Sequence, residues 1–342
     1  PSRINGQTTL GFQFGDLVKM QLGHRSSELL WQGMGGQPSA TLRAATQIAS
    51  TGASADIIAS AALAAMQTSS PDGGFGRAGW SVFAAGDVGT ADTTNVSGVD
   101  EGEAQAFTAG VDYSTGNGVV AGVAFSALDG EVDQNYGLGG STKGDGYAAS
   151  AFAGFANSLA AFDVYLSYSM QDYETNRTVN PAPLVFVNAR GETDGSLLQF
   201  GATLNVPIAT PSKMHGVTIS AVGGGYYGLL NIDGFTETGA GGWSAIVPER
   251  EHESFKAQAG LEFARPFAFG GGVFTPFVRV QANSELIGDG IAFTGSFVAA
   301  PASTFTVAVP ELGDFWGSVA VGATAQLSAD SAIYVRYQNE FN

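Results

Sequence analysis

Apolar and polar residues alternate along most of the chain after about residue 78. In the segment FDVYLSYSMQ (162–171), large apolar residues occupy every second position, and small or polar residues mostly occupy the positions between them. The same period of two recurs at 107–113, 198–206, 257–263 and 317–327. This period is typical of β-strands that have one apolar face. We therefore predict a sheet of many strands over residues 71–342.

The second face of these strands helps to separate a membrane barrel from a soluble β-sandwich, because both classes alternate. That face carries mostly small, uncharged residues, whereas a solvent-exposed sheet would be rich in Lys and Glu. Long loops on one side and short turns on the other are also typical of outer-membrane barrels. In this chain, tight turns such as TGNG (115–118) separate long acidic or Gly-rich stretches at 89–103, 128–145, 173–195, 231–252 and 284–313. The predicted fold class is an all-β transmembrane antiparallel barrel in the outer membrane of a Gram-negative bacterium.

Residues 15–70 show a different spacing. Segment 15–31 carries Leu and Val residues at helical spacings, and segments 39–49 and 54–66 each begin at a Ser suited to capping a helix. We therefore predict a helical linker or plug over 15–70. Its helices could lie in the barrel lumen or pack as a hairpin at the periplasmic mouth, and the sequence leaves both arrangements open.

Composition excludes several classes of protein. The formal net charge is −17, from 14 basic and 31 acidic residues, which argues against binding to nucleic acid. The chain has no cysteine, and therefore no disulfide, thiolate metal site or cysteine nucleophile. No apolar run approaches the ~20 residues of a membrane-spanning helix. No signal peptide is evident at Pro1, so we expect that it was removed or lies upstream.

The sequence predicts no catalytic or metal site. His24, His215 and His252 lack metal-ligand spacing, and the chain has no G-x-S-x-G motif. The acidic clusters at 100–103 and 129–133 lack the spacing of an EF-hand loop, and we interpret them as solvated outer loops. We therefore expect no enzyme activity and no cofactor. An outer-membrane esterase or phospholipase is the least favoured alternative.

Six charged residues are predicted on the strand face opposite the apolar one, which would be the lumen face of a barrel. Such residues could hydrate the pore, bind a threaded helix, or pair with one another across the lumen. The lumen-facing candidates are Asp112, Asp163, Lys256, Glu262, Arg279 and Arg336.

From about residue 74 to 342 the chain resembles the translocator barrel of autotransporters, the type V secretion proteins. The resemblance is carried by GWSVFAAGD (79–87), YYGLLNIDGFTETGA (226–240), TPFVRVQANSEL (275–286) and the region 299–327, in this order. It implies a barrel of about twelve strands with a helix through the pore, and a secreted passenger domain that is absent from this chain. It also implies contact with outer-membrane lipid and lipopolysaccharide, and insertion by the barrel assembly machinery. A passenger-free outer-membrane channel or structural barrel is the alternative function.

The ends of the chain raise the question of how the barrel closes. The alternation predicts about eleven strands between 78 and 341, whereas bacterial barrels normally have an even number. In residues 1–14, the alternating residues Thr8, Leu10, Phe12 and Phe14 end in Phe, as the last strand of the family does. We hypothesise that residues 7–14 close the barrel between 331–341 and 78–88, as in a circular permutation. The alternative is that residues 1–14 are a passenger remnant and the last strand is absent.

Overall fold

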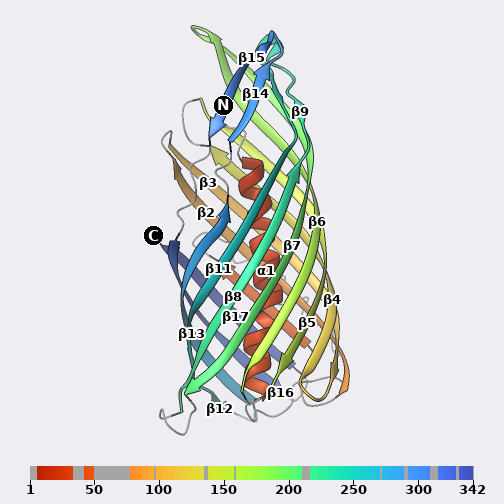
Figure 1. The fold of residues 1–342 in the computed structure, drawn as a ribbon, viewed down its shortest axis with the longest axis vertical. Coiled ribbons are helices and arrows are strands. Elements are labelled where there is room, and N and C mark those ends of the chain that lie inside the picture. Colours follow the sequence, from red (N-terminus) through yellow and green to blue (C-terminus); the bar gives the residue numbers. More distant parts are fainter. Residues whose placement is uncertain are drawn as a thin grey trace.

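A barrel of long strands surrounds one central helix, α1 (Gly6–Gly33) (Figure 1). The computed structural model describes residues 6–33, 42–49, 78–95, 98–134, 138–157, 159–209, 216–269, 272–288, 292–308, 315–328 and 331–341. The long strands are β2 (Ala78–Asn95), β3 (Gly98–Thr115), β4 (Val119–Gln134), β5 (Gly140–Ala156), β6 (Ala161–Ala182), β7 (Val185–Ala209), β8 (Thr218–Ile232), β11 (Arg250–Ala264), β13 (Gly272–Gly288), β16 (Phe315–Ser328) and β17 (Ser331–Phe341). Two short strands, β1 (Leu42–Ala49) and β12 (Phe267–Phe269), belong to the same sheet.

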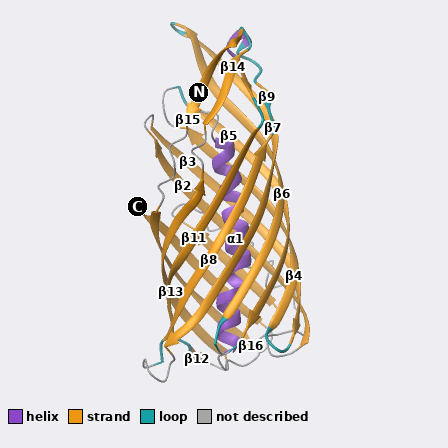
Figure 2. Ribbon diagram, in the orientation of Figure 1, coloured by secondary structure: helices purple, strands orange, loops and turns teal. Residues whose placement is uncertain are grey.

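The sheet closes on itself. Its order is β11-β8-β7-β6-β5-β4-β3-β2-β1-β17-β16-β13-β12, and a further pairing of β11 with β13 completes the ring. The ladders between the long strands are antiparallel, as between β6 and β7. Closure pairs the backbone groups that an open sheet would leave exposed to lipid. The predicted fold class is confirmed, and Figure 2 shows the strands enclosing the helix.

Side chains along each strand alternate between the inside and the outside of the barrel. In β5, every second residue from Thr142 to Ala156 is buried, and the residues between them are exposed. Large apolar side chains point outward, such as Phe125 and Tyr147, whose rings stack with centroids 5.7 Å apart. The period of two in the sequence therefore arises because lipid contacts one face of the strand and the lumen contacts the other.

β1 fills the position between the last long strand and the first. It pairs in parallel with β17 on one side and with β2 on the other. The prediction of a helix at 39–49 is therefore wrong. Without β1, the facing edges of β2 and β17 would carry unpaired N–H and C=O groups, and the need to pair them outweighs the capping signal at Ser39. The helix predicted at 54–66 lies outside the described residues.

Residues 7–14 do not close the barrel. Thr8, Leu10, Phe12 and Phe14 all lie in α1, so the hypothesis of a barrel-closing strand is wrong. Alternation over four residues is too short a pattern to exclude a helix. Leu10, Phe14, Leu17 and Val18 follow one another at spacings of four, three and one, which place them on one helical face. A helix also satisfies its own backbone hydrogen bonds inside the lumen, where the wall strands pair with each other.

A smaller sheet forms a cap beyond the barrel, at the end with the long connections (Figure 1). The cap consists of β9 (Phe235–Thr236), η2 (Gly241–Trp243), β10 (Ala245–Val247), β14 (Ala292–Phe297) and β15 (Ala300–Ala308). Arg177 of β6 ties the cap to the barrel, because its guanidinium donates to both carboxylate oxygens of Glu237, with 2.6 Å between Nε and Oε1. The long connections at 231–252 and 284–313 therefore contain regular structure.

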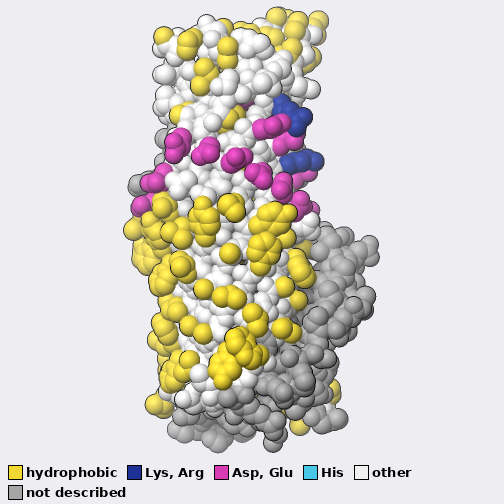
Figure 3. All heavy atoms as spheres, turned by 90° about the vertical axis from the view of Figure 1, so that its right-hand side faces the viewer, with side chains coloured by type: hydrophobic (Ala, Val, Ile, Leu, Met, Phe, Trp, Pro, Cys, Tyr) yellow, Lys and Arg dark blue, Asp and Glu magenta, His cyan; other side chains and the backbone are white. Residues whose placement is uncertain are grey.

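An acidic band, here called the collar, crosses strands β4 to β7 below the cap. Its central row consists of four exposed aspartates that stand opposite one another on neighbouring strands: Asp129, Asp145, Asp172 and Asp194. Figure 3 shows the collar between a broad apolar belt and the upper end of the molecule, where charged side chains are absent from the visible face. The belt is the surface that faces lipid, so the collar marks the upper boundary of the membrane-embedded part.

Candidate functional site

α1 occupies the lumen and packs against the part of the wall formed by β2 to β8. Its buried apolar side chains join wall residues such as Phe83 and Phe152 in one cluster. Among the described helices, none has both the length and the hydropathy required to cross a membrane. The apolar residues of α1 in the cluster are Leu10, Phe14, Leu17, Val18 and Leu22.

Two glycines let α1 approach the wall closely. A Cβ atom at Gly11 would lie 2.8 Å from both Leu230 Cδ2 and Tyr173 Oη, and one at Gly15 would lie 2.7 Å from Leu197 Cδ2. The two glycines are four residues apart and therefore share one helical face. A larger side chain at either position would push the helix away from β6, β7 and β8.

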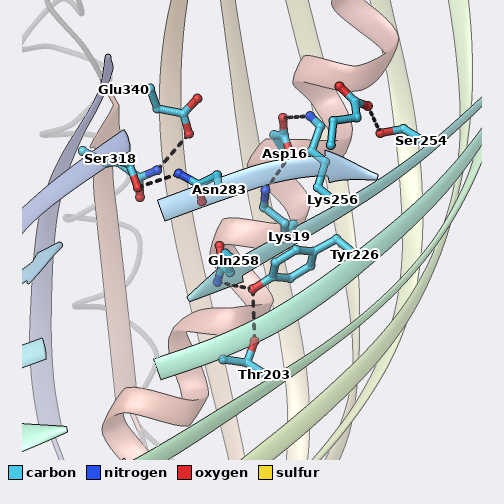
Figure 4. A network of polar contacts seen from close by, with 12 residues as sticks. Asp16, Lys19, Thr203, Tyr226, Ser254, Lys256, Gln258, Asn283, Ser318 and Glu340 are labelled. Atoms are coloured by element: carbon cyan, nitrogen blue, oxygen red, sulfur yellow. Dashed lines mark hydrogen bonds and ion pairs between the residues drawn. The ribbon is translucent and has the colours of Figure 1, made fainter. Parts of the chain in front are cut away.

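Asp16 is the polar centre of the contact between helix and wall (Figure 4). Its carboxylate accepts hydrogen bonds from Lys19 Nζ at 2.7 Å and from Lys256 Nζ of β11 at 3.2 Å. Lys19 Nζ also lies 4.7 Å from the centroid of the Tyr226 ring. The Tyr226 hydroxyl in turn accepts a hydrogen bond of 2.6 Å from Gln258 Nε2. One carboxylate therefore pairs with two cations, one on the helix and one on the wall.

Two glutamines hold α1 on either side of Asp16. Gln7 accepts a hydrogen bond from the guanidinium of Arg250, which begins β11 beside the cap. Gln21 accepts a hydrogen bond from the Thr108 hydroxyl, and its amide donates to the carbonyl of Ala106 at 3.3 Å. The N-terminal end of α1 therefore lies toward the cap, and its later turns lie toward the end with the tight turns (Figure 1).

The six charged candidates from the sequence all lie on wall strands, five buried and Lys256 partly buried. Lys256 reaches α1 through its ion pair with Asp16. Glu262 and Arg279 pair with each other across β11 and β13, with 2.9 Å between Arg279 Nε and Glu262 Oε2. The other three are Asp112 in β3, Asp163 in β6 and Arg336 in β17, where Arg336 donates to Gln338.

The sequence alone does not identify the residues of α1 that contact the wall. The sequence predicts Asp16 in a helix but does not indicate its contact with Lys256, which lies 240 residues away. Arg250 falls in a predicted long loop. The available signal was the pair Gly11 and Gly15, whose spacing favours close packing of a helix. In the described part of the chain, no group of three or more acidic or His residues could hold a metal ion.

We expect Asp16→Asn to loosen α1 in the lumen. The amide would leave Lys19 and Lys256 facing each other without their shared counter-charge. A partly exposed ion pair contributes about 1 kcal/mol, so brief channel openings in single-channel recordings should become about five-fold more frequent. Asp172→Asn removes an exposed carboxylate of the collar and should leave the recordings unchanged. Equal opening frequencies for the two variants would contradict the role of Asp16.

Comparison with known proteins identifies a matching sequence family and similar solved structures. Residues 80–338 match the sequence model of the autotransporter beta-domain family. The translocator domain of the autotransporter NalP from Neisseria meningitidis has a TM-score of 0.58 and 18% identity, over 76% of this chain and 81% of that chain. The beta domain of the Bordetella autotransporter BrkA has a TM-score of 0.51 and 15% identity, over 77% of this chain and 91% of that chain. A search of curated proteins gave no match.

Proposed function

Since this chain belongs to the autotransporter β-domain family, it is an outer-membrane barrel that carries a passenger to the cell surface, and we propose that α1 is the segment that holds the lumen closed behind the passenger. The observation that carries the proposal is the fixation of α1 along the lumen. Apolar packing and hydrogen bonds at Gln7, Asp16 and Gln21 attach it to the wall. A helix with its side chains is about 10–12 Å wide, enough to fill a narrow lumen.

The direction of α1 supports a passenger joined before Gly6. Gln7 contacts Arg250 beside the cap, so a polypeptide that continues beyond this end of α1 would leave the barrel at the cell-surface side. β2 starts at the opposite end, where the tight turns lie. α1 therefore connects the two sides of the membrane through the pore.

The proposal includes no covalent chemistry. Barrels of this family are transport proteins rather than enzymes. The polar wall groups Lys256, Arg250 and Thr108 each contact a polar side chain of α1. We assign these groups to the retention of the helix.

Two partners complete the proposal. The exposed apolar belt would contact outer-membrane lipid, including the acyl chains of lipopolysaccharide in the outer leaflet. Membership of the family also supports insertion by the barrel assembly machinery.

A reporter peptide placed before Pro1 tests the transport function. In intact Gram-negative cells, we expect external protease to remove the reporter, because the N-terminal end of α1 faces outward. The same peptide inserted into the tight turn at 157–160 should stay protected, because this turn lies at the other end of the barrel. A folded barrel whose N-terminal reporter stays protected would contradict the proposed function.

A further inference from the structure

The apex of the β6–β7 hairpin carries an unbroken apolar run at the cell-surface end of the molecule (Figure 1). The run PAPLVFV (181–187) has seven apolar residues, and no charged residue occurs between 178 and 189. Residues 182–186 are all exposed, Leu184 to 90%. Hairpin turns usually carry Gly, Asn or Asp. An exposed apolar run of this length indicates contact with an apolar partner.

Leu184 also has an unusual backbone conformation. Its φ is 63°, and in the described part of the chain it is the one residue other than glycine with a positive φ. Gly or Asn would adopt this conformation with less strain. The presence of a large apolar side chain at this position therefore argues for a role of the side chain itself.

The turn presents few polar groups that a nonpolar medium would leave unpaired. Pro181 and Pro183 have no N–H donor, and Ala182 pairs with Val185 across the hairpin. With its nitrogen turned toward the turn, the Asn180 amide donates to the carbonyls of both Ala182 and Val185, at 3.2 Å for Val185. The apex can therefore leave water at a low desolvation cost.

The apex exposes apolar side chains on both faces. Successive strand residues point to opposite faces, and Leu184, Val185 and Phe186 are 90%, 46% and 57% exposed. A protein groove would cover one face and leave the other in water, whereas lipid surrounds both. We propose that this apex inserts into a neutral lipid bilayer that faces the cell surface. Two residues of extended strand on either side of Leu184 give the apex a length of about 7 Å. This length lies within the ~5–10 Å depth of interfacial insertion.

The charges below the apex favour a neutral bilayer over an anionic one. Arg190 pairs with Glu174 at 2.9 Å and with Glu192 at 3.0 Å, and Arg177 pairs with Glu237, so these cations are already neutralised. The collar beneath them is acidic, and the net charge of the chain is −17. An anionic bilayer would be repelled, whereas phosphatidylcholine, which is zwitterionic, would not.

Flotation with phosphatidylcholine vesicles tests the proposal. The full chain, held in lipid nanodiscs, should float with the vesicles, and it should float less with vesicles that contain phosphatidylglycerol. Leu184→Asp should lower the fraction that floats at least about ten-fold, because it places a charge in the inserted apex. Leu159→Asp, in the tight turn at the other end and 74% exposed, is the matched control and should float like the unchanged chain.

Leu184→Asn keeps the test valid if the Asp variant folds poorly. Asn suits a positive φ, so this variant should retain the barrel, as judged by resistance to unfolding in detergent, and still lose flotation. The proposal is overturned if the unchanged chain does not bind phosphatidylcholine, or if the variants at 184 and 159 float equally. Binding only to vesicles that carry membrane proteins would also overturn it, since the apex would then dock to a protein.

Discussion

Deleting residues 6–33 should convert the barrel into an open ion channel with a several-fold higher conductance. α1 lies along the lumen, and its removal takes away both the apolar cluster and the contacts of Asp16 with the wall. The wall strands pair with one another rather than with α1, so the ring of strands remains complete in the deletion variant. The conductance of single barrels in planar lipid bilayers measures the effect.

Asp16→Asn provides an internal comparison for this deletion. Its openings should be brief and intermittent, because the apolar cluster still holds the helix, whereas the deletion variant should stay open. Resistance to unfolding in detergent confirms that the deletion variant is a folded barrel. If that folded variant conducts no better than the full chain, something other than α1 closes the lumen.

Phe14→Ala should cost about 3–5 kcal/mol of the free energy of unfolding. Phe14 is fully buried between α1 and the wall, in the same cluster as Leu10 and Leu17. Truncation leaves a cavity that the rigid wall cannot close, since the strands are fixed by their pairing. Denaturant unfolding of the barrel in detergent measures the loss, with α1 and the wall monitored separately.

Phe12→Ala is the matched control on the same helix. Phe12 is only partly buried, against the separate group Leu197, Leu230 and Ile232. Its truncation should cost clearly less than that of Phe14. Equal losses for the two variants would show that Phe14 does not hold the helix in the way described.

The strands of the wall were predictable because their pattern is local and long. In β6, outward apolar residues alternate with buried small or polar ones over most of the strand, since lipid and lumen impose opposite requirements on the two faces. The prediction of a strand at 7–14 is wrong because an alternation of only four residues fits a strand and a helix equally well. These residues are Thr8, Leu10, Phe12 and Phe14. The longer helical spacing from Leu10 to Leu22 was the stronger signal.

The remaining features depend on contacts between distant parts of the chain. Residues 39–49 begin at a Ser suited to capping a helix, yet β1 is a strand because it pairs with both β2 and β17. The ion pair of Asp16 with Lys256 joins residues 240 positions apart, so no local pattern reveals it. The run PAPLVFV (181–187) is apolar in the sequence, but the positive φ and the exposure of Leu184 follow only from the structure.

The central claim is that α1 passes through the lumen of a membrane-inserted barrel, and a cross-link between helix and wall tests it most directly. The chain has no cysteine, so Gln21→Cys and Thr108→Cys together introduce one defined pair at a contact between α1 and β3. Phe107→Cys in place of Thr108→Cys is the matched control, because Phe107 points outward from the same strand. A protease site inserted between Gly33 and Leu42 cuts the chain between α1 and β1, so that denaturing electrophoresis shows whether the helix is still joined to the barrel.

After treatment of intact membranes with a short thiol cross-linker and then protease, we expect the helix to remain attached to the barrel in the 21–108 pair and to separate in the 21–107 pair. Separation in both pairs, in a barrel that is folded and inserted, would contradict the account.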